Sequence, residues 1–390
     1  MKIIEIGTGY TAIPAKMGAA TEIVVEQLVK AFDELNQDVE LVDIADKNRL
    51  PNELPIKEVK IPFFSFITDV QLGIMHKIKR VVYSIALVGK LKKIINESED
   101  RLLLHFHNQY NLFFFLKLIG KSARKKVEIA YTVHSYIWPT EWEEIKEIVK
   151  KRYFQEVYCV QKADYVLVLN DKTKEHFIKY LGVDSERIHR VMNGVNTDVY
   201  SIMNECEIEK FKKTIGLSNK RVIFQVGSVC DRKNQFGVVQ MLANYLKEHR
   251  NVVYMYAGGI IDTDYKNRID DFSKKNGIDM QVKYVGELCP GEELNKYYNL
   301  ADATLFPSKI ESFGLVVIES LSAGIPVFLL EKPIFELDGG YSLFHSGEEL
   351  IHLVENQIGS SVSKEKNRRE VIDKYSWNAV ARQHVKIFNL

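Results

Sequence analysis

Short apolar runs rich in β-branched residues alternate with longer amphipathic stretches along the whole chain. Strands are predicted in the first half at KIIEI, VELVDI, RLLLHFH, VEIAYTVH, YVLVLN and RIHRVM. The second half repeats the rhythm with RVIFQVGS, VVYMYAGG, QVKYVGEL, ATLFPS and PVFLL. This alternation is typical of α/β proteins with doubly wound parallel sheets. Because about eleven strands exceed one comfortable sheet, the pattern predicts two domains of similar construction.

The predicted boundary between the two domains is the polar, strand-poor segment 193–220. A chain of 390 residues with 46% hydrophobic residues is long and apolar enough for two cores. We therefore predict a first domain over 1–198 and a second over 199–375.

Charge and cysteine content narrow the function classes. The chain carries 53 basic and 52 acidic side chains, which argues against a nucleic-acid-binding surface over the whole molecule. It has neither an apolar signal core at its start nor an uncharged run of the ~18 residues that span a bilayer. The four cysteines are far apart in the sequence and show no metal-ligand spacing. We expect a soluble cytoplasmic protein, at most peripheral on the inner face of the cell membrane.

Segment 73–95 contains six lysines and arginines and no acid, interleaved with apolar residues. A basic amphipathic helix of this kind binds an anionic membrane surface or attracts an acidic substrate. The alternative is a surface helix with a solvated basic face. The sequence leaves both interpretations open.

The opening GTGYTA, Gly7 to Ala12, matches the glycine fingerprint of a dinucleotide-binding turn after the strand KIIEI. That site needs a helix that begins at the glycines and an acidic residue about 20 residues further on. Here Pro14 interrupts the segment and the helical spacing starts only near Gly18. We therefore interpret residues 7–24 as a long first loop and not as a nicotinamide or flavin site.

The most informative stretch is FPSKIESFGLVVIESLSAGIPV, residues 306–327. Gly314 is predicted to open a helix, which places Glu311 in the loop before it and Glu319 on its second turn. The free N–H groups of such a helix start suit a phosphate, and two carboxylates suit sugar hydroxyl groups. An ordinary helix with one capping and one exposed glutamate is the alternative.

This block resembles the E-x7-E motif of the retaining glycosyltransferases of family four, the glycosyl transferases group 1, which have the GT-B fold. Other segments are similar to the family in the expected order: AKMGAA, TVHSY, NGVNTDVY, VGSVCDRKNQ, YAGG, YVGEL and ADATLFPS. The resemblance implies two Rossmann-like domains facing a central cleft. It also implies that a last helix, 376–390, crosses back to the first domain.

The resemblance implies a set of site residues. Lys233 falls on the family's lysine, Ser228 stands where many members carry arginine, and Arg232 is the candidate for the missing charge. Lys233, Arg232, Glu311 and His134 are the implied catalytic residues, with Glu311 on the transferred sugar and His134 on the acceptor side. The implied donor-binding residues are Gly18, Gly227, Ser228, Leu288 near the base, Phe313, Gly314, Leu315, Val316, and Glu319 on the ribose.

The implied reaction is transfer of a sugar from a nucleotide sugar, UDP-sugar before GDP-mannose, to a hydroxyl of a saccharide or lipid-linked acceptor. We expect no cofactor and no metal, because fixed positive groups can meet the charge of the leaving diphosphate. Four alternatives stay open: a nucleotide-sugar epimerase, a phosphorylase-like enzyme, a dehydrogenase suggested by the opening glycines, and a non-catalytic partner subunit with a transferase fold.

Overall fold

The computed structural model describes the chain except for residues 15–19, 62–73, 135–146, 310–312, 331–335 and 357–363. The described residues form two compact units, one of residues 1–194 with 377–390, the other of residues 195–376. The sequence places the boundary at 198, four residues later. It also assigns the last helix to the first domain, and in the structure that helix belongs to the first unit.

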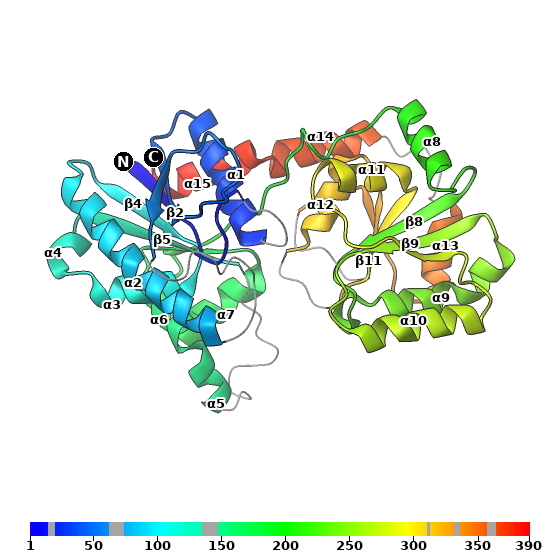
Figure 1. The fold of residues 1–390 in the computed structure, drawn as a ribbon, viewed down its shortest axis with the longest axis horizontal. Coiled ribbons are helices and arrows are strands. Elements are labelled where there is room, and N and C mark those ends of the chain that lie inside the picture. Colours follow the sequence, from blue (N-terminus) through cyan, green and yellow to red (C-terminus); the bar gives the residue numbers. More distant parts are fainter. Residues whose placement is uncertain (15–19, 62–73, 135–146, 310–312, 331–335, 357–363) are drawn as a thin grey trace. The chain divides into compact units, whose positions relative to one another are not determined.

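The first unit contains a seven-stranded sheet in the order β3-β2-β1-β4-β5-β6-β7, with every pair parallel (Figure 1). Its strands are β1 (Lys2–Ile6), β2 (Val39–Ile44), β3 (Ile56–Val59), β4 (Leu102–Phe106), β5 (Val127–Val133), β6 (Tyr165–Val168) and β7 (Ile188–Arg190). Its helices are α1 (Ala20–Glu34), α2 (Ile74–Glu97), α3 (Gln109–Leu118), α4 (Lys121–Arg124), α5 (Glu147–Lys150), the 3₁₀ turn η2 (Lys151–Tyr153), α6 (Phe154–Lys162), α7 (Asp171–Leu181) and α15 (Trp377–Phe388).

The two faces of this sheet are covered by different helices. Helices α1 and α15 pack together, and α2, α3 and α6 form a second row (Figure 1). Side chains of a strand alternate between faces, so Ile4 and Ile6 join the core under α2 and α3. Glu5 points to the other face, where His105 of β4 lies against His384 and Phe388 of α15. A helix from the end of the chain thus covers polar side chains of the first strands.

The second unit contains a six-stranded, fully parallel sheet in the order β10-β9-β8-β11-β12-β13. Its strands are β8 (Arg221–Val226), β9 (Val252–Ala257), β10 (Val282–Tyr284), β11 (Ala303–Phe306), β12 (Val327–Leu329) and β13 (Tyr341–Leu343). Its helices are α8 (Glu205–Thr214), the 3₁₀ turn η3 (Asp231–Lys233), α9 (Gln235–Glu248), α10 (Thr263–Lys275), α11 (Glu292–Leu300), α12 (Leu315–Ser322), α13 (Gly347–Asn356) and α14 (Lys364–Tyr375).

The two parallel sheets confirm the predicted fold class, and the structure adds two strands that the sequence pattern does not predict. Strands β3 and β13 are short edge strands of four and three residues, with too few positions to show a period of two. None of the helices in the described part of the chain is both long and apolar enough to cross a bilayer.

Candidate functional site

The strand order of the second unit has a switch point between β8 and β11. From β8 the chain proceeds outward through β9 and β10, and from β11 it proceeds the other way through β12 and β13. In open parallel sheets, ligands bind at the carboxyl ends of the strands at such a point. The residues that follow β8 and β11 are therefore the strongest candidates for a ligand site.

Lys233 lies in η3, in the loop that leaves β8. Gly227, the first residue after β8, has a φ of +151°, and a side chain there would come within 3.1 Å of the aliphatic part of Lys233. The backbone carbonyl of Lys233 accepts a 2.8 Å hydrogen bond from the side chain of Gln225. The Lys233 ammonium lies 5.5 Å from the centre of the Phe306 ring, at the end of β11. Packing and ring contact thus direct this lysine toward the switch point.

Helix α12 begins next to the same phenylalanine. Its N-cap, Gly314, has a φ of +90°, which side-chain-bearing residues rarely adopt, and a β-carbon there would be 2.9 Å from the Phe306 ring. The first N–H groups of the helix, those of Leu315 and Val316, lack partners within a helix and carry its positive end. Phe313 is buried just before this turn. Lys233 and the start of α12 therefore both lie against the Phe306 ring.

Glu319 lies on the second turn of α12, as the sequence predicts. Its carboxylate accepts a 2.8 Å hydrogen bond from the hydroxyl of Tyr298, and the hydroxyl of Tyr200 is a second donor. Burial raises the pKa of Glu319 to about 7, and these two hydrogen bonds oppose the rise. The carboxyl group is thus balanced between its neutral and ionised forms near neutral pH.

The other predicted residues of this unit are spread around the same loops. The carbonyl of Ser228 accepts a 3.0 Å hydrogen bond from Gln235, while the side chain of Arg232 is exposed to solvent. Leu288 is half-buried, in the loop after β10. Glu311 and Gly18, two of the predicted site residues, lie outside the described residues.

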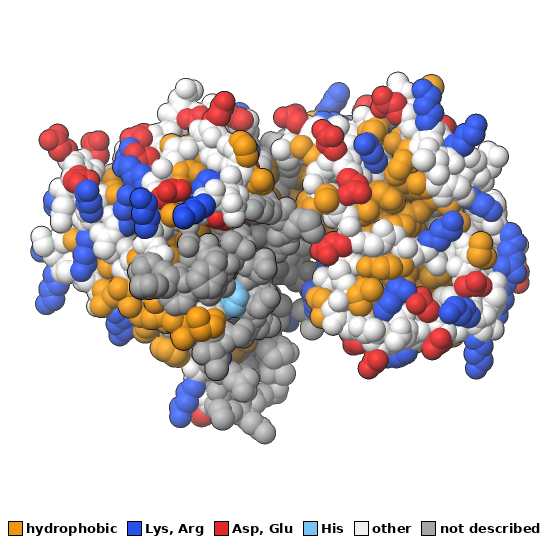
Figure 2. Space-filling model, viewed as in Figure 1, with side chains coloured by type: hydrophobic (Ala, Val, Ile, Leu, Met, Phe, Trp, Pro, Cys, Tyr) orange, Lys and Arg blue, Asp and Glu red, His pale blue; other side chains and the backbone are white. Residues whose placement is uncertain are grey.

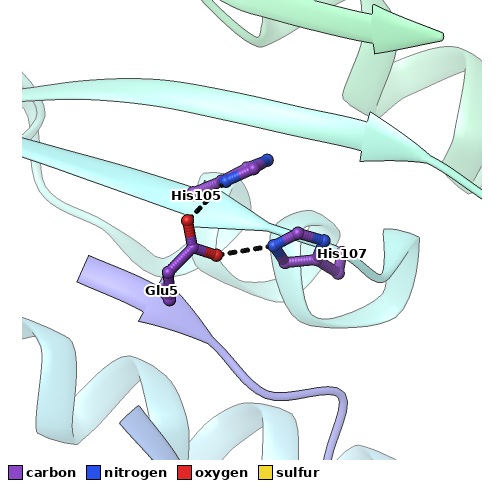
Figure 3. A group of neighbouring side chains, drawn as sticks. All are labelled: Glu5, His105 and His107. Carbon is purple, nitrogen blue, oxygen red and sulfur yellow. Dashed lines mark hydrogen bonds and ion pairs between the residues drawn. The ribbon is translucent and has the colours of Figure 1, made fainter. Parts of the chain in front are cut away.

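His134 follows β5 in the first unit and belongs to a group of hydrogen-bonded side chains. Its Nε2 lies 2.9 Å from Nδ1 of His107, whose Nε2 lies 2.7 Å from the carboxylate of Glu5. The other oxygen of Glu5 is 2.7 Å from Nδ1 of His105 (Figure 3). The switch point of this sheet falls between β1 and β4, the strands that carry Glu5 and His105. Both sheets therefore gather polar groups at equivalent places.

Glu5, His105 and His107 are also the residue types that bind divalent cations, and their polar atoms lie within 4.8 Å of one another. In the structure, however, the carboxylate contacts both rings directly at hydrogen-bond distance. Burial by itself would raise the pKa of Glu5, but the two imidazoles lower it to about 2. Burial lowers the pKa of His107 to about 4. These contacts describe an ionised carboxylate held by two ring N–H groups.

The opening glycines pack against the first unit itself. A side chain at Gly7 would overlap Asp43, and one at Gly9 would overlap the Tyr83 ring. The Nδ2 group of Asn111 donates to the carbonyls of Gly7 and Thr8 at 3.2 and 3.0 Å. Helix α1 begins only at Ala20, so the glycines do not form its start. The loop interpretation of the fingerprint agrees with these contacts.

Sequence reasoning missed Phe306, Tyr298 and the Glu5–His105–His107 group. Phe306 is the last apolar residue of the strand-like run ATLFPS that precedes the glutamates, and this position at a strand end could have marked it as a site residue. The spacing of the two histidines in LLLHFH was another, because a strand turns alternate residues to one face. Their partner Glu5 is a hundred residues away in the sequence, and no local pattern connects them.

The fold defines the class of protein. Two doubly wound parallel domains, each with polar groups at its switch point, are the architecture of the GT-B class. A solved structure of this class, Anabaena HepE in complex with UDP and glucose, matches with a TM-score of 0.71 and 15% identity. The match covers 100% of this chain and 99% of that one.

Sequence comparison identifies the family. Residues 21–199 match the Glycosyltransferase Family 4 model and residues 207–335 match the Glycosyl transferases group 1 model. The chain therefore belongs to the family-four glycosyltransferases.

Curated relatives of the chain are similar over part of their length. An uncharacterized glycosyltransferase of Methanocaldococcus jannaschii is 22% identical over 237 residues, covering 58% of this chain and 60% of the relative. A D-inositol 3-phosphate glycosyltransferase of Corynebacterium kroppenstedtii is 24% identical over 247 residues, covering 60% of this chain and 54% of the relative.

Proposed function

We propose that the protein is a retaining hexosyltransferase that moves a sugar from a nucleotide-sugar donor to a hydroxyl of a saccharide or lipid-linked acceptor. A UDP-sugar is the favoured donor and GDP-mannose the second candidate. The observation that carries the proposal is the Phe306 ring, which holds Lys233 and the N-terminus of α12 at one switch point. Membership of the family and the UDP and glucose in the Anabaena complex support it.

In the proposed reaction, the bond between the sugar C1 and the diphosphate oxygen breaks, and the acceptor oxygen bonds to C1 on the same face. Lys233, assisted by Arg232 and the amides of Leu315 and Val316, meets the charge that develops on the diphosphate. The leaving diphosphate oxygen takes the proton of the acceptor hydroxyl. These groups perform the reaction without a metal or other cofactor.

The remaining roles follow the same scheme. Glu319 accepts hydrogen bonds from the ribose hydroxyls, and Leu288 lies near the base. Glu311 holds the transferred sugar, and His134 lines the acceptor side. The Ser228 backbone and the glycine at 227 border the diphosphate, where a larger residue would displace Lys233.

The test compares two lysine variants of the same strand region. Lys233→Ala should lower turnover of the donor by ~10² to 10³, because one fixed charge in a transition state contributes about that much. Lys220→Ala is the matched control: Lys220 precedes β8, at the amino-terminal end of that strand, and donates to the carbonyl of Arg250 at 2.9 Å. Near-normal turnover by a folded Lys233→Ala protein would contradict the proposal.

The transfer assay, together with nucleotide-binding and thermal-stability measurements, separates the alternatives. Nucleotide release that depends on an added acceptor supports a transferase or a phosphorylase-like enzyme, and a glycosidic product rather than a sugar phosphate distinguishes the transferase. Product from the donor alone indicates an epimerase. Thermal stabilisation by NAD or NADP, and none by UDP or GDP, would favour a dehydrogenase. Nucleotide binding without turnover of any donor and acceptor pair would favour a non-catalytic subunit.

We also propose that α2 docks on an anionic membrane surface, where a lipid-linked acceptor of cell-surface polysaccharide or glycoconjugate synthesis would be found. Its outer face exposes Met75, Ile78, Val81 and Ile85, at helical spacing and between 42 and 51% exposed. Hydrophobic side chains gather over this helix on the face shown in Figure 2. Single exposed apolar residues are ordinary, but a stripe along one helix is typical of an interfacial surface.

The charge on this helix is smaller than the sequence suggests. Lys79 is 5% exposed and donates to the carbonyl of Tyr10, and Arg80 stacks on the rings of Tyr10 and Tyr110. Lys77 and Lys93 remain exposed. Apolar insertion, with the lysines assisting, is therefore the proposed mode of binding.

Sedimentation with vesicles that contain phosphatidylglycerol tests the surface. We expect binding at low salt that Ile78→Ser together with Ile85→Ser reduces. Ile260→Ser with Ile261→Ser, two exposed isoleucines of the other unit, is the control and should leave binding unchanged. The idea fails if the wild-type protein does not sediment with such vesicles.

A further inference from the structure

Among the described residues, the side chains around Glu5 form one continuous series of hydrogen bonds. It runs from Thr132 to His105, from there to Glu5, then to His107 and His134. Its four links are 2.7, 2.7, 2.7 and 2.9 Å long. The first four members are buried in the first unit, and His134 at the end is half-buried. The chain thus connects the core of the sheet with a predicted site residue.

The sheet itself holds these hydrogen-bonded side chains in place. Glu5 of β1 and His105 of β4 are register partners in the parallel pair, and Thr132 lies on the neighbouring strand β5. His107 and His134 follow the carboxyl ends of β4 and β5, and their rings stack with centroids 5.2 Å apart. The rings of His105 and His107 are therefore each held by a backbone position and by two polar contacts, and the ring of His134 is held by its backbone position and its contact with His107.

The positions of the protons follow from the ionised carboxylate. A carboxylate only accepts hydrogen bonds, so Nε2 of His107 must carry a proton and donate to Glu5. Neutral His107 then has a lone pair at Nδ1, which accepts from Nε2–H of His134. Burial lowers the pKa of His107 to about 4, and burial with the neighbouring His107 holds the pKa of His134 well below its usual value. Both rings are neutral at pH 7.

The hydrogen bonds on the His105 side of Glu5 do not change this result. Whether His105 is neutral or charged, its Nδ1–H donates to Glu5 and its Nε2 meets the hydroxyl of Thr132, which both donates and accepts. The direction of the bonds from Glu5 through His107 to His134 stays the same.

We infer that Glu5, acting through His107, fixes the Nε2–H tautomer of His134, so that its Nδ1 is an unprotonated acceptor for a hydroxyl group of the sugar substrate. Glu5 and His107 are positioning residues in this scheme. The assignment of the ring's proton rests on the hydrogen-bond geometry and on the ionised carboxylate of Glu5, whereas the substrate hydroxyl rests on the proposed function. A neutral acceptor can hold a hydroxyl proton without adding positive charge near the sugar.

The tautomer is measured by ring ¹⁵N NMR of the histidine-labelled protein without any substrate, with the His134 signals assigned by their loss in His134→Gln. At pH 7 we expect Nε2 of His134 to be protonated and Nδ1 to be bare. A His134 ring protonated at Nδ1 overturns the inference. Stoichiometric zinc or iron in the purified protein, lost in Glu5→Gln, also overturns it, because a cation would replace the hydrogen bonds of Glu5.

A pair of variants tests the role of Glu5. In Glu5→Gln the amide oxygen accepts a hydrogen bond from one histidine and the amide N–H donates to the other. It can donate to Nδ1 of His105 if His105 moves its proton to Nε2, from where it donates to the hydroxyl of Thr132. Glu5→Gln with Thr132→Val disfavours that arrangement, because Nε2–H of His105 would then be a buried donor without an acceptor. The amide should therefore donate to Nε2 of His107, which turns the proton of His107 toward His134 and converts His134 to the Nδ1–H form. Thr132→Val alone should leave the His134 tautomer unchanged. Retention of the Nε2–H form in the folded double variant would overturn the role of Glu5.

Transfer kinetics then separate this inference from the proposed function. The double variant should lose about tenfold in kcat relative to Thr132→Val, about the value of one hydrogen bond. Equal kcat values would overturn the contact between His134 and a substrate hydroxyl. If the wild-type protein transfers no sugar at all, the proposed function fails, while the NMR result still decides the tautomer.

Discussion

Glu319 makes the proposed donor site sensitive to pH. A carboxyl group accepts hydrogen bonds from two ribose hydroxyls best when it is ionised, yet burial raises its pKa to about 7 in the free protein. Donor binding must therefore be coupled to loss of a proton from Glu319. Affinity should rise as the pH rises through 7 and level off once the carboxyl is ionised in the free protein.

The magnitude follows from the ionised fraction. With a pKa of about 7, the fraction is about one eleventh at pH 6 and about ten elevenths at pH 8. The affinity should consequently fall about tenfold from pH 8 to pH 6, or about 1.4 kcal/mol. Because the hydroxyl of Tyr298 stabilises the ionised form, Tyr298→Phe should move the midpoint of this change to higher pH.

Isothermal titration calorimetry with UDP-glucose measures this effect. The sugar ester is chosen because the terminal phosphate of free UDP titrates near pH 6 and would add a pH dependence of its own. Glu319→Gln is the control, which should bind more weakly and with the same affinity at both pH values. A wild-type affinity that changes less than twofold between pH 6 and pH 8, or a tenfold change in Glu319→Gln, would refute the reasoning.

Two further predictions concern backbone and core. Gly314→Ala forces a side chain into a φ of +90° against Phe306 and should lower the free energy of unfolding by ~1–3 kcal/mol in urea titrations, with weaker UDP-glucose binding. Gly89→Ala, in α2 with open space around it, should instead be neutral or stabilising by up to ~1 kcal/mol. Phe224→Ala should lower the free energy of unfolding by ~3–5 kcal/mol, because this fully buried ring packs on Tyr297 and Tyr298; a loss below 1 kcal/mol by calorimetry would contradict that packing.

Some predictions from the sequence depend only on local order, and these agree with the structure. The helix expected near Gly18 begins at Ala20, and the helix expected at Gly314 begins at Leu315. Glu319 lies on its second turn as predicted. Each of these three predictions depends on the spacing of apolar residues and glycines within a few helical turns, because that spacing determines where a helix begins and which face a side chain occupies.

Contacts between distant segments could not be predicted in this way. Lys79 counts as part of a basic face in the sequence, but the structure turns it inward to the carbonyl of Tyr10. Phe306 is an ordinary apolar residue in its run, and it acquires a role only because the loop after β8 brings Lys233 to its ring. Such roles depend on which loops meet at one edge of the sheet.

Periodicity and ordered motifs along the chain were enough to predict the two doubly wound domains and the family, because both are recorded in local spacing. The contact of Glu5 with His105 and His107, by contrast, follows only from the folded arrangement of the strands. The crossover from β3 through α2 places β4 next to β1, and this brings residues a hundred positions apart into hydrogen-bond contact. A buried carboxylate has no local signal of its own, since its pKa and its partners are set by the groups that the fold packs around it.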